Sequence, residues 1–231
     1  MHIVVVNGSS YGRRGVTSMI TTPFCDGIRS AGGTVETVAL NKLDIHPCRG
    51  DLSCWFKTRN VCVQKDDMAG LVEKFTAADC ILIATPVYCD GVPGTLKVMM
   101  DRLVVLGSPF LEIRDGHTRH PLPEDVATKR LVLIATCGLW EMDNFTPMVT
   151  HLEAYCRNLG LVFTGALLRP HSFAMRNEPV NDLLRAAKNA GRALVEKGTI
   201  NKEYINCIGR ELVSSERYVD MLNTKAACYL Q

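Results

Sequence analysis

The sequence predicts an α/β protein in which a parallel sheet carries helices on both faces. Short apolar runs rich in Val and Ile alternate along the chain with segments whose apolar residues have helical spacing. The two clearest runs, Cys80–Ala84 and Arg130–Thr136, are apolar at successive positions, which is typical of central strands buried on both faces. Strand–helix alternation of this kind gives a parallel sheet covered on both sides.

Five strands are expected, followed in most cases by a helix. The strands are placed at Ile3–Asn7, Thr34–Leu40, Cys80–Ala84, Arg130–Thr136 and Leu161–Leu167. The helices are placed at Thr17–Ala31, Asp67–Ala78, Thr95–Leu106, Pro147–Leu159 and Asn181–Glu196. Asp66 and Asp67 have the side-chain chemistry of helix N-caps, so we expect the second helix to begin there. The order of the strands does not follow from the pattern alone.

Composition and charge are those of an ordinary globular protein. The chain has 231 residues, 47% of them hydrophobic and 22% charged, which favours a single compact domain. A net charge of +2 gives no support for a nucleic acid or an acidic membrane as partner. No apolar run approaches the roughly 18–20 residues that span a bilayer. The first strand begins at residue 3, which leaves no room for an export signal, and the ten cysteines then indicate a reducing cytoplasmic location.

Three segments interrupt the alternation of strands and helices. Residues 46–66 and 107–128 are treated as insertions in a domain of residues 1–198, and residues 199–231 as a C-terminal helical tail. Long loops are commonly functional or interfacial. The apolar and aromatic spacing of the tail predicts a helix that docks on the domain or forms an oligomer contact.

Three loops follow expected strands directly and share an unusual composition. They are Gly8–Ser18, Thr85–Gly94 and Thr136–Asp143. Ligands of open parallel sheets bind beyond the carboxyl ends of the strands, so we expect the loops to meet at one edge. The first is rich in Gly, Ser, Thr and Arg and precedes a helix N-terminus, which suits a phosphate group. The other two contain aromatic residues, so the set predicts a planar ring tethered to a phosphate.

These loops carry a resemblance to a known family. Gly8-Ser9 with Thr17-Ser18, and the segment Thr85–Lys97 followed by Asp101-Arg102, resemble the flavodoxin-like NAD(P)H-dependent FMN oxidoreductases. The similarity covers residues 1–175 and points to the branch of the iron–sulfur flavoproteins and their cluster-less relatives. It implies a flavodoxin-like three-layer sandwich with strand order 2-1-3-4-5. It further implies FMN as cofactor and a homodimer or homotetramer.

The resemblance also implies which residues hold FMN. The phosphate is assigned to Ser9, Arg13, Thr17 and Ser18, the isoalloxazine to Pro86, Val87, Tyr88, Cys89, Asp90 and Gly91, and the flavin edge to Cys137, Gly138 and Trp140. The first loop has Ser10-Tyr11 in place of the family's Pro-Arg and is about one residue longer, so the arginine that meets the phosphate stays open. Trp140 has an alternative, packing under the long loop. Asp101-Arg102 are expected in a structural ion pair or an interface.

A cysteine-rich loop matches the iron–sulfur branch incompletely. That branch has C-x2-C-x2-C and a later fourth Cys, whereas the corresponding positions here are Cys48, Asp51, Cys54 and Cys62. Three alternatives stay open: a [4Fe–4S] cluster with Asp51 as a ligand, zinc held by three sulfurs and one oxygen, or a metal-free loop. We favour the metal-free loop, with structural or redox-paired cysteines. The histidines have no metal-binding spacing, and His46, His151 and His171 are expected to be solvated or locally hydrogen-bonded.

The expected function is that of an FMN-dependent oxidoreductase. In the family, NAD(P)H delivers hydride to flavin N5, and the electrons pass to a second acceptor such as a quinone, nitro compound, flavin, iron or protein. The flavin carries the chemistry, so no catalytic side chain is assigned. The alternative is an electron carrier without NAD(P)H activity of its own. A redox sensor is a third hypothesis. The chain has no G-x-G-x-x-G fingerprint, so the choice between NADH and NADPH stays open.

Overall fold

A five-stranded parallel sheet forms the middle layer of the protein in the computed structural model, which describes residues 1–121 and 129–230. The strands are β1 (His2–Asn7), β2 (Thr34–Ala39), β3 (Cys80–Pro86), β6 (Arg130–Thr136) and β7 (Val162–Arg169). Their spatial order is β2-β1-β3-β6-β7, and each neighbouring pair is parallel. Numbered along the chain, this order is 2-1-3-4-5, as the resemblance implied.

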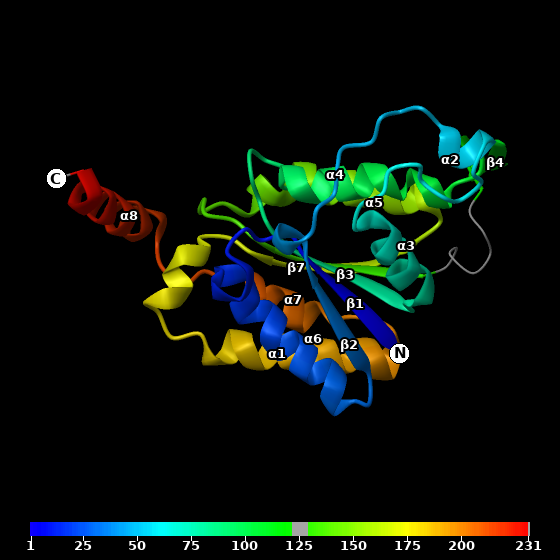
Figure 1. Ribbon diagram of the computed structural model, residues 1–231. Helices are drawn as coiled ribbons and strands as arrows, with labels where there is room; N and C mark the ends of the chain where they lie inside the picture. Colours follow the sequence, from blue (N-terminus) through cyan, green and yellow to red (C-terminus); the bar gives the residue numbers. More distant parts are fainter. Residues whose placement is uncertain (122–128, 231) are drawn as a thin grey trace.

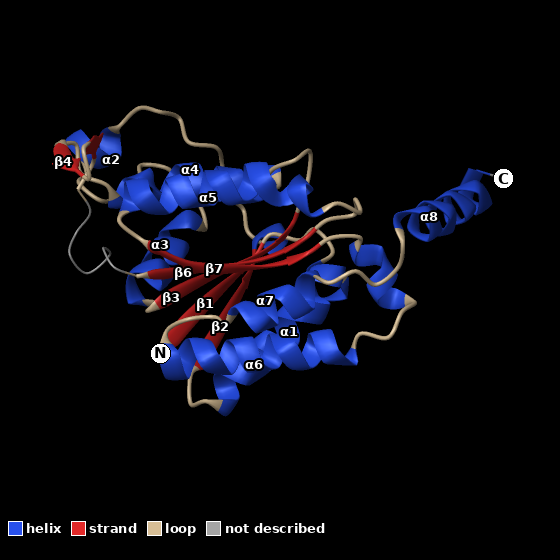
Figure 2. Cartoon of the chain, turned by 180° about the vertical axis from the view of Figure 1, so that it is seen from behind, coloured by secondary structure: helices blue, strands red, loops and turns tan. Residues whose placement is uncertain are grey.

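Helices cover both faces of this sheet, which confirms the predicted three-layer sandwich (Figures 1 and 2). One face carries α1 (Val16–Ser30), α6 (Asn181–Lys197) and α7 (Lys202–Gly209), and the other carries α3 (Met68–Ala77), α4 (Gly94–Arg102) and α5 (Thr146–Leu159). Side chains of a strand alternate between faces. Ile3 and Val5 of β1 therefore enter the core under α1 and α6, whereas Val4 and Val6 enter the opposite core.

The helices α1 and α6 pack with their backbones in contact. A Cβ atom added to Gly27 would lie 1.8 Å from the carbonyl oxygen of Lys188, and one added to Gly191 would lie 2.0 Å from that of Phe24. Only glycine fits at either position. This crossing fixes α1, whose first turn lies next to the loop after β1.

The two insertions lie side by side at the end of the molecule opposite α8 (Figure 1). Residues 46–66 contain α2 (Ser53–Phe56), and the second insertion contains the antiparallel pair β4 (Glu112–Arg114) and β5 (His117–Arg119). Trp55 joins the two insertions, because its ring centroid lies 4.7 Å from that of His120. The last part of the predicted insertion 107–128, residues 122–128, lies outside the described residues.

The buried Arg102 at the end of α4 fastens the first insertion. Its guanidinium forms a two-point ion pair with Asp66, at 2.6 Å and 3.0 Å, and donates to the carbonyl of His46 at 2.8 Å. Asp66 also accepts from the amide of Met68, at 3.1 Å, at the start of α3. Asp67, the other expected cap, instead accepts from the amide of Asp44 at 2.8 Å. The expectation of a structural ion pair at Arg102 is confirmed.

The C-terminal tail consists of α7 and α8 (Ser215–Leu230). Helix α7 packs on the sheet side of α6, whereas α8 projects away from the sandwich (Figure 1). Tyr218, in the first turn of α8, is buried.

Short 3₁₀ segments lie at Gly12–Arg14 (η1), Leu40–Lys42 (η2), Leu103–Leu106 (η3), Met142–Phe145 (η4) and Ser172–Arg176 (η5). No helix in the described part of the chain is both long and apolar enough to cross a bilayer.

Candidate functional site

A cavity of about 320 Å³ opens beyond the carboxyl ends of β1, β3, β6 and β7. Its walls come from the three predicted loops and from a fourth segment after β7. The lining residues are Ser9, Tyr11, Gly15, Val16, Thr17, Pro86, Val87, Tyr88, Thr136, Gly138, Ser172, Phe173 and Arg176. Ser9, Thr17, Pro86, Val87, Tyr88 and Gly138 are the predicted site residues among them. The sheet-edge rule thus brings all three predicted loops to one cavity.

The N-terminus of α1 forms the polar end of this cavity. Its N-cap, Gly15, forms no side-chain capping bond, and the amides of Val16 and Thr17 have no hydrogen-bond partner within residues 1–121 and 129–230. A Cβ atom on Gly15 would lie 2.7 Å from the hydroxyl of Ser9. Free amides, a hydroxyl and the positive end of the helix dipole together suit a phosphate dianion.

The other predicted phosphate residues have different neighbours. The hydroxyl of Thr17 lies 2.7 Å from that of Thr136, which joins the first loop to the end of β6. Ser18 donates to the carbonyl of Gly12 at 2.8 Å and so closes the loop on itself. Arg13 lies on η1 and lines a separate groove beside β2. The assignments of Ser18 and Arg13 therefore rest on the resemblance alone.

The loop after β3 makes a tight turn at the cavity wall. Tyr88 and Gly91 exchange two backbone hydrogen bonds of 3.0 Å, and Cys89 and Asp90 between them have positive φ angles of 46° and 61°. Such left-handed conformations are costly for residues other than glycine, and they concentrate at functional sites. The turn engages the amides of Tyr88 and Gly91. The amides of Cys89 and Asp90 have no partner in the described structure and can still donate.

The loop after β6 contributes Gly138 to the cavity and turns its other predicted residues away. Cys137 is buried, and burial raises the pKa of its thiol. Trp140 stacks on His171 with 5.7 Å between ring centroids and donates its indole N–H to the carbonyl of Val213 at 3.0 Å. Trp140 therefore packs on the C-terminal tail, and not under the long loop.

A fourth loop, after β7, was missed by the sequence analysis. It supplies Ser172, Phe173 and Arg176, and Phe173 is 48% exposed at the cavity mouth. A Cβ atom on Gly138 would lie 2.9 Å from the Phe173 ring, so that glycine makes room for the aromatic side chain. Arg176 donates to the carbonyl of Arg14 at 2.9 Å and joins this loop to the first. The only sequence signal that could have identified this loop is its position directly after a strand, because the segment lacks the glycine that the other three loops contain.

A buried polar cluster fixes this wall from behind. Arg169 donates to the carbonyls of Pro170, Ile208 and Arg210 at 2.7–2.8 Å, and burial lowers its pKa to about 10. His171 accepts from Arg169 and, at 3.1 Å, from the amide of Leu212. Both donors meet Nε2, so the imidazole is neutral with its proton on Nδ1, which faces the carbonyl of Trp140.

Burial and the charge of Arg169 keep His171 neutral, because together they lower its pKa to about 4. His171 was expected to be solvated or locally hydrogen-bonded, and the second alternative is the one found. The hydroxyl of Tyr218 completes the cluster by donating to the carbonyl of Gly138 at 2.7 Å. Burial raises the pKa of this hydroxyl to about 12, so Tyr218 stays a donor.

The side chains of the cysteine loop are not arranged as a metal site in the described structure. Among the described residues, no group of three or more His, Cys, Asp or Glu side chains is arranged to hold a metal ion. Asp51 accepts from the amide of Ser53 at 2.8 Å, and hydrogen bonds from Ser53 lower its pKa. The Arg102 guanidinium lies 3.3 Å from the sulfur of Cys62, where it adds positive charge. Asp51 stands where the cluster-binding pattern has a cysteine, so the loop lacks the fourth thiolate of that pattern, and we assign no step to a cluster.

Comparisons with known proteins agree with this geometry. Residues 1–145 match the family model described as NADPH-dependent FMN reductase. The iron–sulfur flavoprotein of Methanosarcina thermophila is 36% identical over 78 residues, which are 34% of this chain and 40% of that protein. The FMN-dependent NADH:quinone oxidoreductase of Azospirillum brasilense is 28% identical over 171 residues, covering 69% of this chain and 79% of that protein.

Solved structures show the same fold. An FMN-dependent NADH-azoreductase from Bacillus anthracis str. Ames Ancestor, solved with FMN, has a TM-score of 0.60 and 14% identity, covering 86% of this chain and 99% of that one. The sheet order, the helical layers and the cavity at the sheet edge define a flavodoxin-like protein. The chain belongs to the NADPH-dependent FMN reductase family. It spans about half the length of the iron–sulfur flavoproteins it matches, from 40% to 51%.

Proposed function

We propose that the protein is an FMN-dependent oxidoreductase that takes hydride from NAD(P)H and passes electrons to a second acceptor. One observation carries the proposal: the cavity at the sheet edge ends on the uncapped N-terminus of α1, where the amides of Val16 and Thr17 are free in the described structure. A phosphate-bearing ring system fits that combination. Family membership supports FMN as the ligand.

The residues that would hold FMN fall into two groups. Ser9 and the amides of Val16 and Thr17 would bind the phosphate, and Tyr88, Gly138 and Phe173 of the cavity lining would surround the ring. The turn that continues from Tyr88 to Gly91 does not line the cavity and would border the ring from outside it. Bound FMN supplies a ring that accepts hydride at N5 and releases electrons to an acceptor. The free amides of Cys89 and Asp90 can donate to the polar edge of such a ring. Tyr218 and His171 hold the opposite wall through Gly138 and Trp140.

The proposed acceptor is a small molecule with a planar ring. Tyr11, Tyr88 and Phe173 are 71%, 42% and 48% exposed around the cavity, so they offer ring faces to a flat substrate. A quinone is consistent with this, and the Azospirillum relative is named a quinone oxidoreductase. A protein is the alternative acceptor. We further propose that the chain forms a homodimer or homotetramer and is cytoplasmic.

The test uses a charge placed at the proposed phosphate site. Thr17→Glu puts a carboxylate at the N-terminus of α1, and Thr22→Glu makes the same change at an exposed position of the same helix. We expect wild type and Thr22→Glu to purify yellow or to take up added FMN, and Thr17→Glu to stay colourless. Equal FMN uptake by both variants would refute the phosphate site.

Activity is tested on the FMN-loaded wild type. Under anaerobic conditions, NADPH or NADH should bleach the flavin band, and an added quinone should restore it. The rate of bleaching by NADPH or NADH is compared with the rate of quinone reduction when another reductant supplies the electrons. If bleaching by the nucleotides is far slower, the oxidoreductase proposal is contradicted and the electron carrier is indicated instead.

A further inference from the structure

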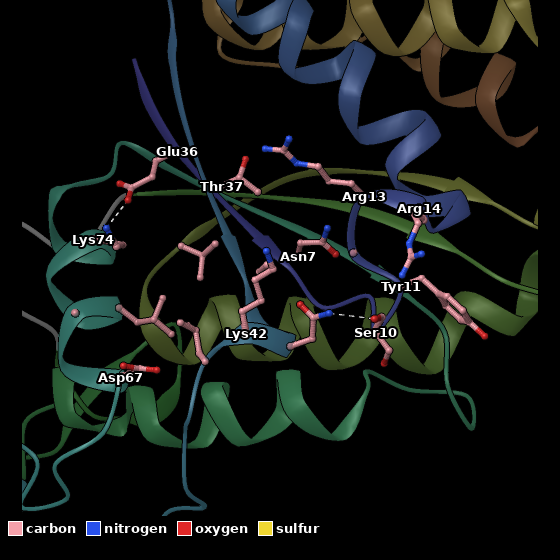
Figure 3. Close-up of a pocket in the computed structure, with 17 residues that line it drawn as sticks. Asn7, Ser10, Tyr11, Arg13, Arg14, Glu36, Thr37, Lys42, Asp67 and Lys74 are labelled. Atoms are coloured by element: carbon pink, nitrogen blue, oxygen red, sulfur yellow. Dashed lines mark hydrogen bonds and ion pairs between the residues drawn. The ribbon is translucent and has the colours of Figure 1, made fainter.

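A second and larger hollow, of about 900 Å³, lies beside β2 (Figure 3). It is a groove with η1 on one side, the start of α3 on the other and β2 along its floor. Tyr11 lines both this groove and the candidate FMN cavity, so the two are neighbours. Ligand pockets typically have volumes of about 300–1,000 Å³, and the groove is within that range. The function proposed above leaves it without a role.

The groove has an excess of positive charge. Four cations line it, against the two carboxylates of Glu36 and Asp67. Lys74 is paired with Glu36. The side chains of Arg13, Arg14 and Lys42 form no ion pair or hydrogen bond within the described residues. In Figure 3, Arg13 extends over Thr37 and Lys42 rises toward Asn7, whereas Arg14 points down beside Tyr11. Three unpaired cations around one hollow suit a phosphate dianion.

The remaining lining can bind the polar groups of a nucleoside. β2 is an edge strand, so those of its peptide groups along residues 37–39 that point away from β1 are not used by the sheet. The side chain of Asn41 donates to the carbonyl of Ser10 at 3.0 Å and holds the first loop against η2. Donors and acceptors therefore line the floor of the groove.

We propose that this groove binds the 2′-phosphorylated adenosine half of NADPH, with Arg13, Arg14 and Lys42 around the 2′-phosphate. The inference rests on the proposed function, because the nicotinamide half would then lie in the neighbouring FMN cavity, with Tyr11 between the halves. NADH has a hydroxyl in place of that phosphate and leaves the three cations unused. The groove therefore selects NADPH over NADH, a choice that the sequence left open.

The first experiment measures binding without hydride transfer. FMN-loaded protein is titrated calorimetrically with 2′,5′-ADP, with 5′-AMP and with inorganic phosphate. We expect 2′,5′-ADP to bind about tenfold more tightly than 5′-AMP, a difference that corresponds to roughly 1.4 kcal/mol. Lys42→Ala should remove most of this difference without releasing FMN, and Lys57→Ala, an exposed lysine of the first insertion, should leave it unchanged. Equal affinities for both nucleotides in the wild type would overturn the inference, as would an unchanged difference in Lys42→Ala.

The second experiment separates this inference from the proposed function. The KM values of NADPH and NADH are compared in wild type and Lys42→Ala, with a lower KM for NADPH expected only in wild type and with kcat similar in both. If both nucleotides are oxidised with equal KM and the titration shows no preference, the groove assignment fails while the oxidoreductase stands. If neither nucleotide reduces the flavin but 2′,5′-ADP is still preferred, the oxidoreductase fails while the binding site stands.

Discussion

The hydroxyl of Tyr218 and the carbonyl of Gly138 are joined by a hydrogen bond of 2.7 Å between residues that are 80 positions apart in the chain. Gly138 lines the cavity after β6, and Tyr218 lies in the first turn of α8. The C-terminal tail is thereby a support for the wall of the candidate FMN site. Removing this support should affect the site without touching any residue that lines it.

Tyr218→Phe removes that hydrogen bond and keeps the ring. We expect the free energy of unfolding to fall by about 1 kcal/mol, because one buried hydrogen bond is lost. The freed Gly138 loop should also weaken FMN binding about three- to tenfold, as measured by quenching of flavin fluorescence. Tyr229→Phe, on an exposed position of the same helix, is the control and should change neither quantity. An unaltered FMN affinity in Tyr218→Phe would show that the tail does not support the site.

Stability should depend on pH through His171. Its pKa is about 4 in the folded protein and near 6.5 in the unfolded chain, so the unfolded chain takes up the proton first. The contribution of the neutral imidazole is complete above pH 6.5 and is lost as the pH falls toward 4, by roughly 2–3 kcal/mol. Urea titrations across this range measure it. His171→Asn, which tolerates the left-handed backbone here, should flatten that part of the curve; an unchanged curve would refute the role of His171.

The Arg102–Asp66 pair should be a strong determinant of stability. Its side chains are 1% and 0% exposed, and Asp66→Asn leaves the guanidinium buried without a counter-charge. We expect a loss of about 3 kcal/mol in the free energy of unfolding. Asp101→Asn breaks the exposed pair between Lys97 and Asp101 and should cost less than about 1 kcal/mol. Similar losses in both variants would contradict the difference in burial.

The crossing of α1 and α6 should not accept even one added methyl group. Gly191→Ala would force its Cβ against the Phe24 carbonyl, and we expect a loss of about 3 kcal/mol in the free energy of unfolding. Gly70→Ala is the matched change in α3, where a Cβ meets nothing within 4 Å, and it should stabilise by about 0.5–1 kcal/mol. Thermal unfolding of both variants gives the comparison, and a neutral Gly191→Ala would contradict the packing.

The cysteine loop should be independent of the flavin. Because its side chains do not form a metal-holding group in the described structure, we expect Cys54→Ala to bind FMN as wild type does. Iron and zinc analysis of anaerobically purified wild type should give substoichiometric values. Stoichiometric iron with a broad visible absorbance that disappears in Cys54→Ala would contradict this expectation.

Local sequence patterns predicted almost all of the strands and helices that form the three layers. The apolar runs at β1, β3 and β6 and the helical spacing of α1, α5 and α6 predicted those elements with ends displaced by a few residues. Their signal is local, because a strand buried on both faces is apolar at successive positions. The resemblance, and not the pattern, supplied the strand order.

The site was predicted as far as strand ends determine it. Arg13 was assigned to the phosphate; it lies on η1 and lines the groove beside β2, so that assignment still rests on the resemblance. The position of the Trp140 side chain depends on its contacts with the carbonyl of Val213 and the ring of His171. Both partners are distant in sequence, so the local pattern around Trp140 does not predict them. Phe173 was missed because its loop has neither the glycine nor the hydroxyl pattern of the others.

Arg169 should make the unfolding of the protein cooperative. Its charge is surrounded by carbonyl oxygens of which two, those of Ile208 and Arg210, come from the end of α7 and the residue after it. If the chain after β7 peeled away on its own, a cation would be stranded inside the protein without those oxygens. Release of α7 from the sheet and global unfolding should therefore coincide. Calorimetry should record a single heat-absorption peak, and proteases should not cleave the chain between β7 and α8 before the whole protein unfolds.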